Sequence, residues 1–115
     1  MLLVLDSNEY IFSFGIFKKH PSKVLVDTIL ITFPIHSIRI SRLIVEEVRR
    51  HLTPEEFKEF IGFATNITAI DEDIIVPFEL GAKYESIGFK PADAFISAYV
   101  EWTGAEVLVT ENRHF

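Results

Sequence analysis

The chain has 115 residues, no cysteine, 49% hydrophobic residues and a formal net charge of −6. This length suits one domain, residues 1–115, and the apolar content excludes a disordered chain, while the lack of cysteine excludes disulfides, thiolate zinc sites and a thiol nucleophile. The negative charge argues against a broadly basic nucleic-acid-binding surface, but not against an acidic site that holds metal ions. No apolar run approaches the roughly 18 residues of a membrane helix, and the N-terminus lacks signal-peptide features, so we expect a cytoplasmic protein without a membrane partner.

In the first half of the chain, apolar runs and helix breakers predict two strands and three helices. The run Leu2–Leu5 is typical of a strand buried in a parallel sheet. Residues 8–17 favour a helix, and a second helix is expected over 22–32, although its β-branched residues also suit a strand. Residues 38–40 fit a short strand that leads into a helix over 41–52.

The second half continues the alternation of helices and strands. The tetrapeptide at 53–56, Thr-Pro-Glu-Glu, is a strong helix start, because it combines a capping residue, proline and an acid three residues on. A third strand is expected at 67–70, followed by an acidic loop, and helices are expected over 77–88 and 91–104. Residues 106–110 complete the pattern as a final strand. The alternation predicts an α/β fold, a three-layer α/β/α sandwich with a parallel central sheet.

Acidic residues follow the elements at which a parallel sheet collects functional groups, beyond the carboxyl ends of its strands. Asp6 directly follows the first strand, and Thr110 ends the last one. On the helix over 41–52, Glu47 lies roughly 100° from the centre of the apolar face and Glu46 roughly 160° from it, so Glu47 is the better candidate for a shared pocket. Asp93 lies in the first turn of the last helix, where the helix dipole also favours an acid.

These three carboxylates come from the first strand, a middle helix and the last helix, and together can hold one or two divalent ions. A single carboxylate binds Mg²⁺ poorly, because the ion keeps most of its waters and prefers two or more charged oxygens. Oxygen ligands without cysteine favour Mg²⁺ or Mn²⁺ over zinc. Such a site activates water and stabilises charge on a phosphodiester.

Three segments carry a resemblance to a known family: VLDSN at the first strand, ISRLIVEEVRRHL in the middle and PADAFISAYVEWTGAEVLVTENRHF at the end. Together they resemble the PIN domain, and in particular the toxin nucleases of VapC type, over most of the chain. The last segment is the most specific, because an acid at a helix start, a strand and Thr-x-Asn with a terminal Phe form a recurrent PIN ending. The resemblance implies a metal-dependent endoribonuclease acting on single-stranded RNA. It implies Asp6, Glu47 and Asp93 as catalytic acids and metal ligands, Asn112 as a further ligand, and Ser7, Asn8 and Thr110 as supporting residues.

Partners follow partly from the resemblance and partly from composition. A VapC-type toxin implies RNA and a cognate antitoxin protein as partners. The mean hydropathy of +0.27 is high for a core of this size and predicts a homodimer. We expect grouped basic residues to guide phosphates on the otherwise acidic surface, although such groups also suit an ordinary solvated face. These residues are Arg39, Arg42, Lys18, Lys19 and Lys23.

Two departures from the family pattern support an alternative function. Asn112 stands where the family often has a fourth acid, which keeps an oxygen ligand but loses a charge. The sequence also ends at Phe115, where many PIN domains continue with a further edge strand. The alternative is a catalytically degenerate PIN-like module that dimerises or binds a partner protein.

Overall fold

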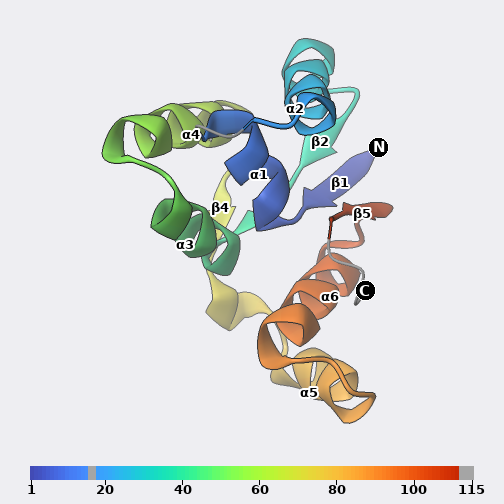
Figure 1. Ribbon diagram of the computed structural model, residues 1–115. Coiled ribbons are helices and arrows are strands. Elements are labelled where there is room, and N and C mark those ends of the chain that lie inside the picture. Colours follow the sequence, from blue (N-terminus) through green and yellow to red (C-terminus); the bar gives the residue numbers. More distant parts are fainter. Residues whose placement is uncertain (16–17, 112–115) are drawn as a thin grey trace.

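A short parallel sheet forms the centre of the molecule. The computed structural model describes residues 1–15 and 18–111, and Figure 1 shows their arrangement. Strands β1 (Leu2–Leu5), β2 (Ser37–Ile38) and β5 (Val107–Val109) form a parallel sheet in the order β2-β1-β5. Strands β3 (Ile40–Ser41) and β4 (Ile70–Asp71) pair as a second parallel sheet. The prediction of a parallel α/β fold is therefore confirmed.

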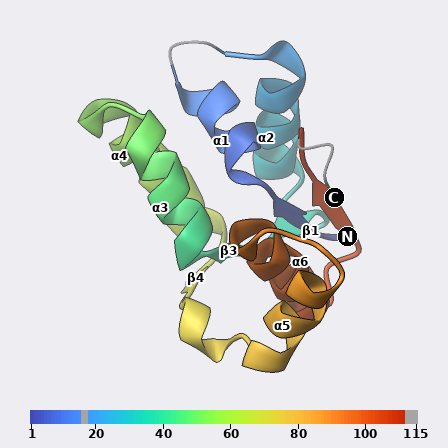
Figure 2. The ribbon, with the colours of Figure 1, turned by 60° about the horizontal axis from the view of Figure 1, so that its bottom comes forward.

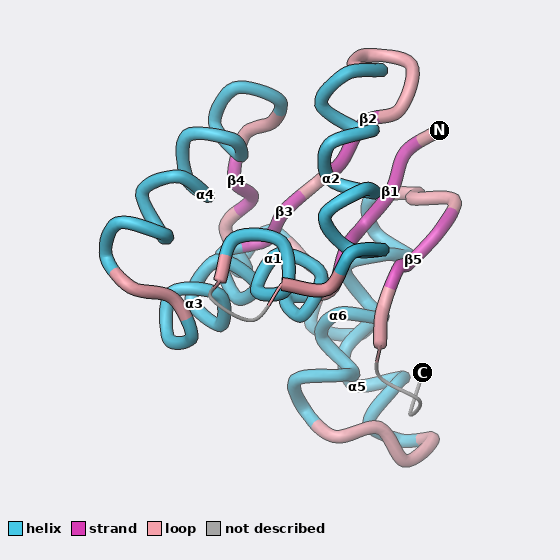
Figure 3. Tube along the Cα trace, turned by 45° about the horizontal axis from the view of Figure 1, so that its top comes forward, coloured by secondary structure: helices cyan, strands magenta, loops and turns pink. Residues whose placement is uncertain are grey.

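One extended segment supplies strands to both sheets. Residue Arg39 separates β2 from β3, and its backbone N–H donates to the carbonyl of Leu3 at 3.1 Å. The strand expected over 38–40 is thus divided in two, with β2 pairing to β1 and β3 pairing to β4. Figure 3 shows the strands following one another across the molecule as β4, β3, β2, β1 and β5.

Within residues 1–15 and 18–111, six α-helices surround the strands in two groups. Helices α2, α3 and α4 pack around α1, whereas α5 packs against α6. Figures 1 and 2 show the α5–α6 pair set apart from the other four helices. This division follows from right-handed crossovers, because the chain moves outward from β1 to β4 and then returns to β5 on the other side of β1. The bounds are α1 Ser7–Phe14, α2 His20–Thr32, α3 Arg42–His51, α4 Pro54–Ile67, α5 Phe78–Ser86 and α6 Pro91–Thr103.

Local signals define most helix boundaries. The Ser41 side chain accepts from the backbone N–H of Ile44 and caps α3. Thr53 and Glu56 form a complete capping box at the start of α4. Gly104, in the left-handed conformation with φ of 73°, ends α6. The helix predicted over 8–17 is observed over Ser7–Phe14, and residues 16 and 17 lie outside the described residues.

The predicted strand over 67–70 is wrong at its start. Ile67 ends α4, because it continues a buried stripe of that helix at helical spacing with Phe60, Phe63 and Ala64. Only Ile70 and Asp71 pair with β3. Of the expected acidic loop, Asp71 therefore belongs to a strand, and Asp73 begins a 3₁₀ turn (Asp73–Ile75).

The core lies between the sheet and α1, α3, α4 and α6. Val4, Leu5 and Ile40 from the strands are fully buried, as are Ile44 and Val48 from α3. Burial of such aliphatic side chains is the main favourable contribution to folding. Among the described helices, none is long and apolar enough to cross a membrane.

Candidate functional site

Asp6 lies at the carboxyl end of β1, with both carboxylate oxygens engaged by neighbouring donors. Its backbone N–H donates to the carbonyl of Val109 at 2.9 Å, which extends the pairing of β1 with β5. Its Oδ1 accepts from the backbone N–H of Ser7 at 2.8 Å, and its Oδ2 accepts from Thr110 Oγ1 at 2.9 Å. Asp6 is only 7% exposed. The expected proximity of Asp6 and Thr110 is confirmed, and the carboxylate is held in one orientation.

Glu47 reaches the same end of the sheet from α3. Its Oε2 accepts from Ser7 Oγ at 2.7 Å, and Ser7 Oγ lies 3.5 Å from Asp6 Oδ1. The neighbouring Glu46 instead pairs with Arg49 at 2.7 Å on the exposed side of the helix. The prediction that Glu47, and not Glu46, points inward is therefore confirmed. Ser7 connects the two carboxylates.

Asp93 completes a set of three acidic residues around one cavity. The cavity has a volume of about 350 Å³, and Asp93 reaches it from the first turn of α6. It lies where the strand order reverses about β1, which is the place where open parallel sheets bind ligands. The residues that line it are Asp6, Ser7, Asn8, Ile11, Glu47, Arg50, His51, Ala92, Asp93 and Ile96.

The donor types at this cavity fit Mg²⁺ or Mn²⁺, although the predicted convergence onto one ion is not observed. Carboxylate and hydroxyl oxygens are the ligands these ions prefer, and Mg²⁺ is commonly held by one or two carboxylates together with waters. Within residues 1–15 and 18–111, no three acidic or histidine side chains lie close enough together to hold one metal ion. Asn112, the expected further ligand, lies outside the described residues.

Two of the predicted phosphate-guiding residues form ion pairs elsewhere. Arg39 donates from Nε and Nη2 to the two carboxylate oxygens of Asp71, both at 2.9 Å, and Arg42 Nη2 lies 3.0 Å from Glu72 Oε1. Neither arginine lines the acidic cavity. The sequence did not reveal these pairs, because their acidic partners lie about thirty residues further along the chain.

The Arg39–Asp71 pair is half-buried and shifts the pKa values of its members. Burial alone would raise the pKa of Asp71, but hydrogen bonds from Arg39 and Tyr99 outweigh burial and lower it. Burial and the Asp71 hydrogen bond raise the pKa of the Tyr99 hydroxyl. The hydrogen bond to Asp71 also raises the pKa of Arg39. This arrangement stabilises the junction of β4 and α6.

Of the three predicted lysines, Lys18 and Lys19 lie between α1 and α2, and Lys23 lies in α2. Lys18 Nζ donates to the carbonyl of Gly15 at 2.8 Å, and Lys19 Nζ lies 3.4 Å from Glu111 Oε2. Lys23 pairs with Asp27 at 3.3 Å within α2. None of the three lines the acidic cavity.

Two basic residues at this cavity were missed by the sequence analysis. Arg50 and His51 line it from the last turn of α3. His51 Nδ1 lies 2.9 Å from the carbonyl oxygen of Glu47. Helical spacing could have predicted them, because positions three and four residues after Glu47 lie on the same face of the helix.

The fold is similar to that of a solved structure. A chain in the crystal structure of VapBC2 from Rickettsia felis, bound to a DNA fragment from their promoter, superposes with a TM-score of 0.65. The two sequences are 17% identical, and the match covers 97% of this chain and 88% of that chain. No protein-family model matches the sequence, and neither does any curated protein sequence. The likeness shows that the fold is PIN-like.

Proposed function

We propose that this protein is a metal-dependent endoribonuclease of the VapC toxin type. One observation carries the proposal: Asp6, Glu47 and Asp93 come from three separate elements and line one cavity at the reversal point of a PIN-like sheet. The fold likeness to a chain of VapBC2 supports it. The reaction is hydrolysis, in which water adds to phosphorus and the P–O3′ bond breaks to leave a 5′-phosphate and a 3′-hydroxyl.

Each residue of the cavity has a role that follows from its contacts. Asp6, Glu47 and Asp93 would hold one or two Mg²⁺ or Mn²⁺ ions, with waters as the remaining ligands, and these ions would supply charge stabilisation at the phosphoryl group and an acidified water. The Ser7 N–H and the Thr110 hydroxyl fix the orientation of the Asp6 carboxylate. The Ser7 hydroxyl does the same for Glu47. Positioning of this kind is the main way in which a protein assists phosphoryl chemistry.

The test is cleavage of a mixed pool of single-stranded RNA by pure protein with Mg²⁺ or Mn²⁺. We expect cleavage that EDTA stops, and products with 5′-phosphate and 3′-hydroxyl ends. Asp93→Asn removes a charge with almost no change of shape, so the variant should fold normally and lose cleavage by a factor of about 100 or more.

A matched pair of variants separates the site from general charge effects. Glu47→Gln and Glu46→Gln remove the same charge from adjacent positions of α3, one facing Ser7 and the other facing Arg49. We expect cleavage to fall only in Glu47→Gln. Equal activity in the two variants, or cleavage by wild type that persists in EDTA, contradicts the proposal.

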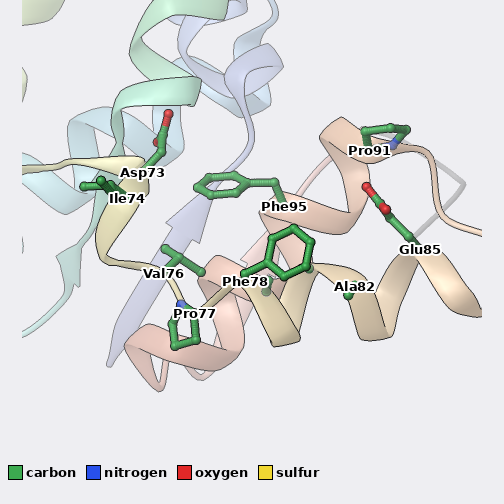
Figure 4. Close-up of a pocket in the computed structure, with 11 residues that line it drawn as sticks. Asp73, Ile74, Val76, Pro77, Phe78, Ala82, Glu85, Pro91 and Phe95 are labelled. Atoms are coloured by element: carbon green, nitrogen blue, oxygen red, sulfur yellow. The ribbon is translucent and has the colours of Figure 1, made fainter.

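A second candidate function is a partner-binding module without activity. An apolar cavity of about 490 Å³ between α6 and the 73–82 region favours it (Figure 4). Figure 4 shows Phe95 projecting from α6 towards the loop that carries Val76. Beside the cavity, Ile74 is 90% exposed and Phe78 is 84% exposed, which is unusual for large apolar side chains. We propose that this surface joins two copies of the chain, and that an antitoxin is a second partner.

A further inference from the structure

A second cavity adjoins the acidic one. It has a volume of about 480 Å³ and lies between the end of α1 and the turn from α3 to α4. Ile11, Arg50 and His51 line both cavities, so the two are neighbours along a single surface. A ligand that fills the acidic cavity therefore has room to extend into the second.

An aromatic ring and aliphatic side chains line the second cavity, and the Lys19 ammonium lies over one face of that ring. Phe12 and Leu52 line it together with Ile11. The carboxylate of Glu56, also in the lining, accepts from the backbone N–H of Thr53 in the capping box. Aromatic side chains of this kind bind nucleobases of any sequence by stacking, because every base has a π-face.

Arg50, Lys18 and Lys19 lie in the lining of this cavity or contact it, although the chain is acidic as a whole. Lys19 Nζ lies 4.2 Å from the centre of the Phe12 ring, and Lys18 Nζ donates to the carbonyl of Gly15 in the lining. Arg50 stands in the wall shared with the acidic cavity. An apolar pocket with cations around it fits a nucleotide, which joins a stacking base to an anionic phosphate.

Arg50 differs from the other arginines of the described chain. Arg39, Arg42 and Arg49 each form an ion pair with a carboxylate. Within residues 1–15 and 18–111, Arg50 forms none, although it lines a cavity with three acidic residues. A guanidinium without a carboxylate partner retains its full capacity to bind a phosphate through two donors.

We propose that the second cavity is a base-binding subsite for the nucleotide next to the cleaved phosphodiester, and that Arg50 binds the phosphate between them. This inference rests on the proposed ribonuclease function and deepens it by locating the substrate. An acidic peptide fits the cations as well, but carboxylate side chains alone offer no aromatic ring to stack on Phe12. A nucleotide satisfies the ring and the cations together.

The test measures binding of adenosine 5′-monophosphate and of ribose 5-phosphate by amide NMR shifts of the wild-type protein with Mg²⁺. Neither probe contains a bond that the proposed reaction cleaves. Adenosine 5′-monophosphate should shift the amide resonances of Phe12, Leu52 and Arg50. Ribose 5-phosphate should shift the amide resonance of Arg50 and leave those of Phe12 and Leu52 unchanged. Loss of the base should weaken binding about fivefold or more, as expected for one stacked base.

Matched variants assign the two contacts. Arg50→Ala should weaken both probes, whereas Arg49→Ala, one residue away and paired with Glu46, should weaken neither. Phe12→Ala should weaken adenosine 5′-monophosphate about fivefold without affecting ribose 5-phosphate. If Phe12→Ala does not fold, Phe12→Leu keeps an apolar side chain and still removes the stacking face. Phe78→Ala, an exposed ring at a different cavity, is the control.

Each outcome decides the proposal. Equal affinity for the two probes, equal effects of Arg49→Ala and Arg50→Ala, or absence of nucleotide shifts at Phe12 and Leu52 overturns it. If binding follows the prediction and wild type cleaves no RNA, the ribonuclease proposal fails while the subsite stands. If wild type cleaves RNA but binds the two probes equally well, the subsite proposal fails while the ribonuclease proposal stands.

Discussion

The carboxylate of Asp71 connects β4 to two neighbouring side chains, Arg39 and Tyr99. Arg39 donates two hydrogen bonds to it, and the Tyr99 hydroxyl donates a third. The Arg39 guanidinium lies 5.3 Å from the centre of the Trp102 ring. The lowered pKa of Asp71 means that the folded state favours the ionised carboxylate, so this cluster stabilises the fold where Asp71 is charged.

We predict that Asp71→Asn lowers the free energy of unfolding at pH 7 by about 1–2 kcal/mol, since part of the pair is screened by solvent. A depressed pKa gives stability that is complete above the unfolded pKa of about 3.9 and is lost as the pH falls through the folded value. The difference between wild type and Asp71→Asn should therefore hold from pH 7 to about 5 and shrink below pH 4. Urea unfolding at several pH values measures it.

Glu72→Gln is the control for this prediction. It removes the same charge from the adjacent residue, whose partner Arg42 is exposed. We expect little change in stability at any pH. A wild-type advantage over Asp71→Asn that grows as the pH falls towards 3 would contradict the assignment.

Arg39 and Arg50 show that the sequence alone does not identify which arginine is available to bind a phosphate. Both are arginines near predicted element ends, and only Arg39 was expected to guide phosphates. The structure pairs Arg39 with Asp71, 32 positions away, and leaves Arg50 beside the acidic residues. Sequence alone cannot choose between them, because the choice depends on which carboxylates the fold brings close.

Glycine positions give a prediction at the level of helices. Gly62 lies inside α4, and Gly104 ends α6 with φ of 73°. A Cβ added at either position meets no atom within 4 Å, so alanine tests the backbone alone. We expect Gly62→Ala to raise the free energy of unfolding by up to about 1 kcal/mol, and Gly104→Ala to lower it by about 1 kcal/mol.

Denaturant unfolding of the two variants checks this prediction. Both variants replace glycine by alanine, so their effects on the unfolded chain are similar. Opposite changes in the free energy of unfolding therefore reflect the different backbone conformations of Gly62 and Gly104 in the folded state. If both variants are more stable than wild type, then α6 does not end with Gly104 in the left-handed conformation.

Elements with strong local signals were predicted closely, and elements that depend on tertiary pairing were not. The capping residues Ser41 and Thr53 and the stop at Gly104 are local chemistry, and they mark the observed boundaries. The division of the 37–41 segment at Arg39 leaves strands of two residues, which are too short to carry a periodic pattern.

At the scale of the whole molecule, the exposed apolar surface at Ile74 and Phe78 predicts self-association. We expect light scattering to give twice the chain mass of 13.2 kDa at high concentration. The double variant Ile74→Ser and Phe78→Ser should be monomeric, since it removes the two most exposed large apolar side chains beside the cavity.

Ile31→Ser provides the comparison for this experiment. Ile31 is 82% exposed on α2 and is not part of the same cavity. We expect it to leave the oligomeric state unchanged. A monomer at all concentrations for wild type, or dissociation by Ile31→Ser alone, would refute the assigned interface.

The arrangement of the acidic residues was predictable because topology determines it. Strand–helix alternation predicts parallel strands, and parallel strands bring Asp6 and Thr110 to the same edge. Helical geometry predicted the inward direction of Glu47. The exact separation of the carboxylates was not predictable, because it depends on side-chain conformations across three elements.

The hydrogen bond from Thr110 to Asp6 joins residues 104 positions apart, and this has a consequence for biosynthesis. A ribosome makes β1 first, and β1 gains its β5 neighbour only when residues 107–109 emerge. Closing so long a span costs chain entropy and places this contact among the slow, non-local steps of folding. When Asp6, Glu47 and Asp93 have all emerged from the ribosome, the nascent chain therefore still lacks the Thr110 hydroxyl that orients Asp6. The cavity matures only after residues 107–110 have been translated.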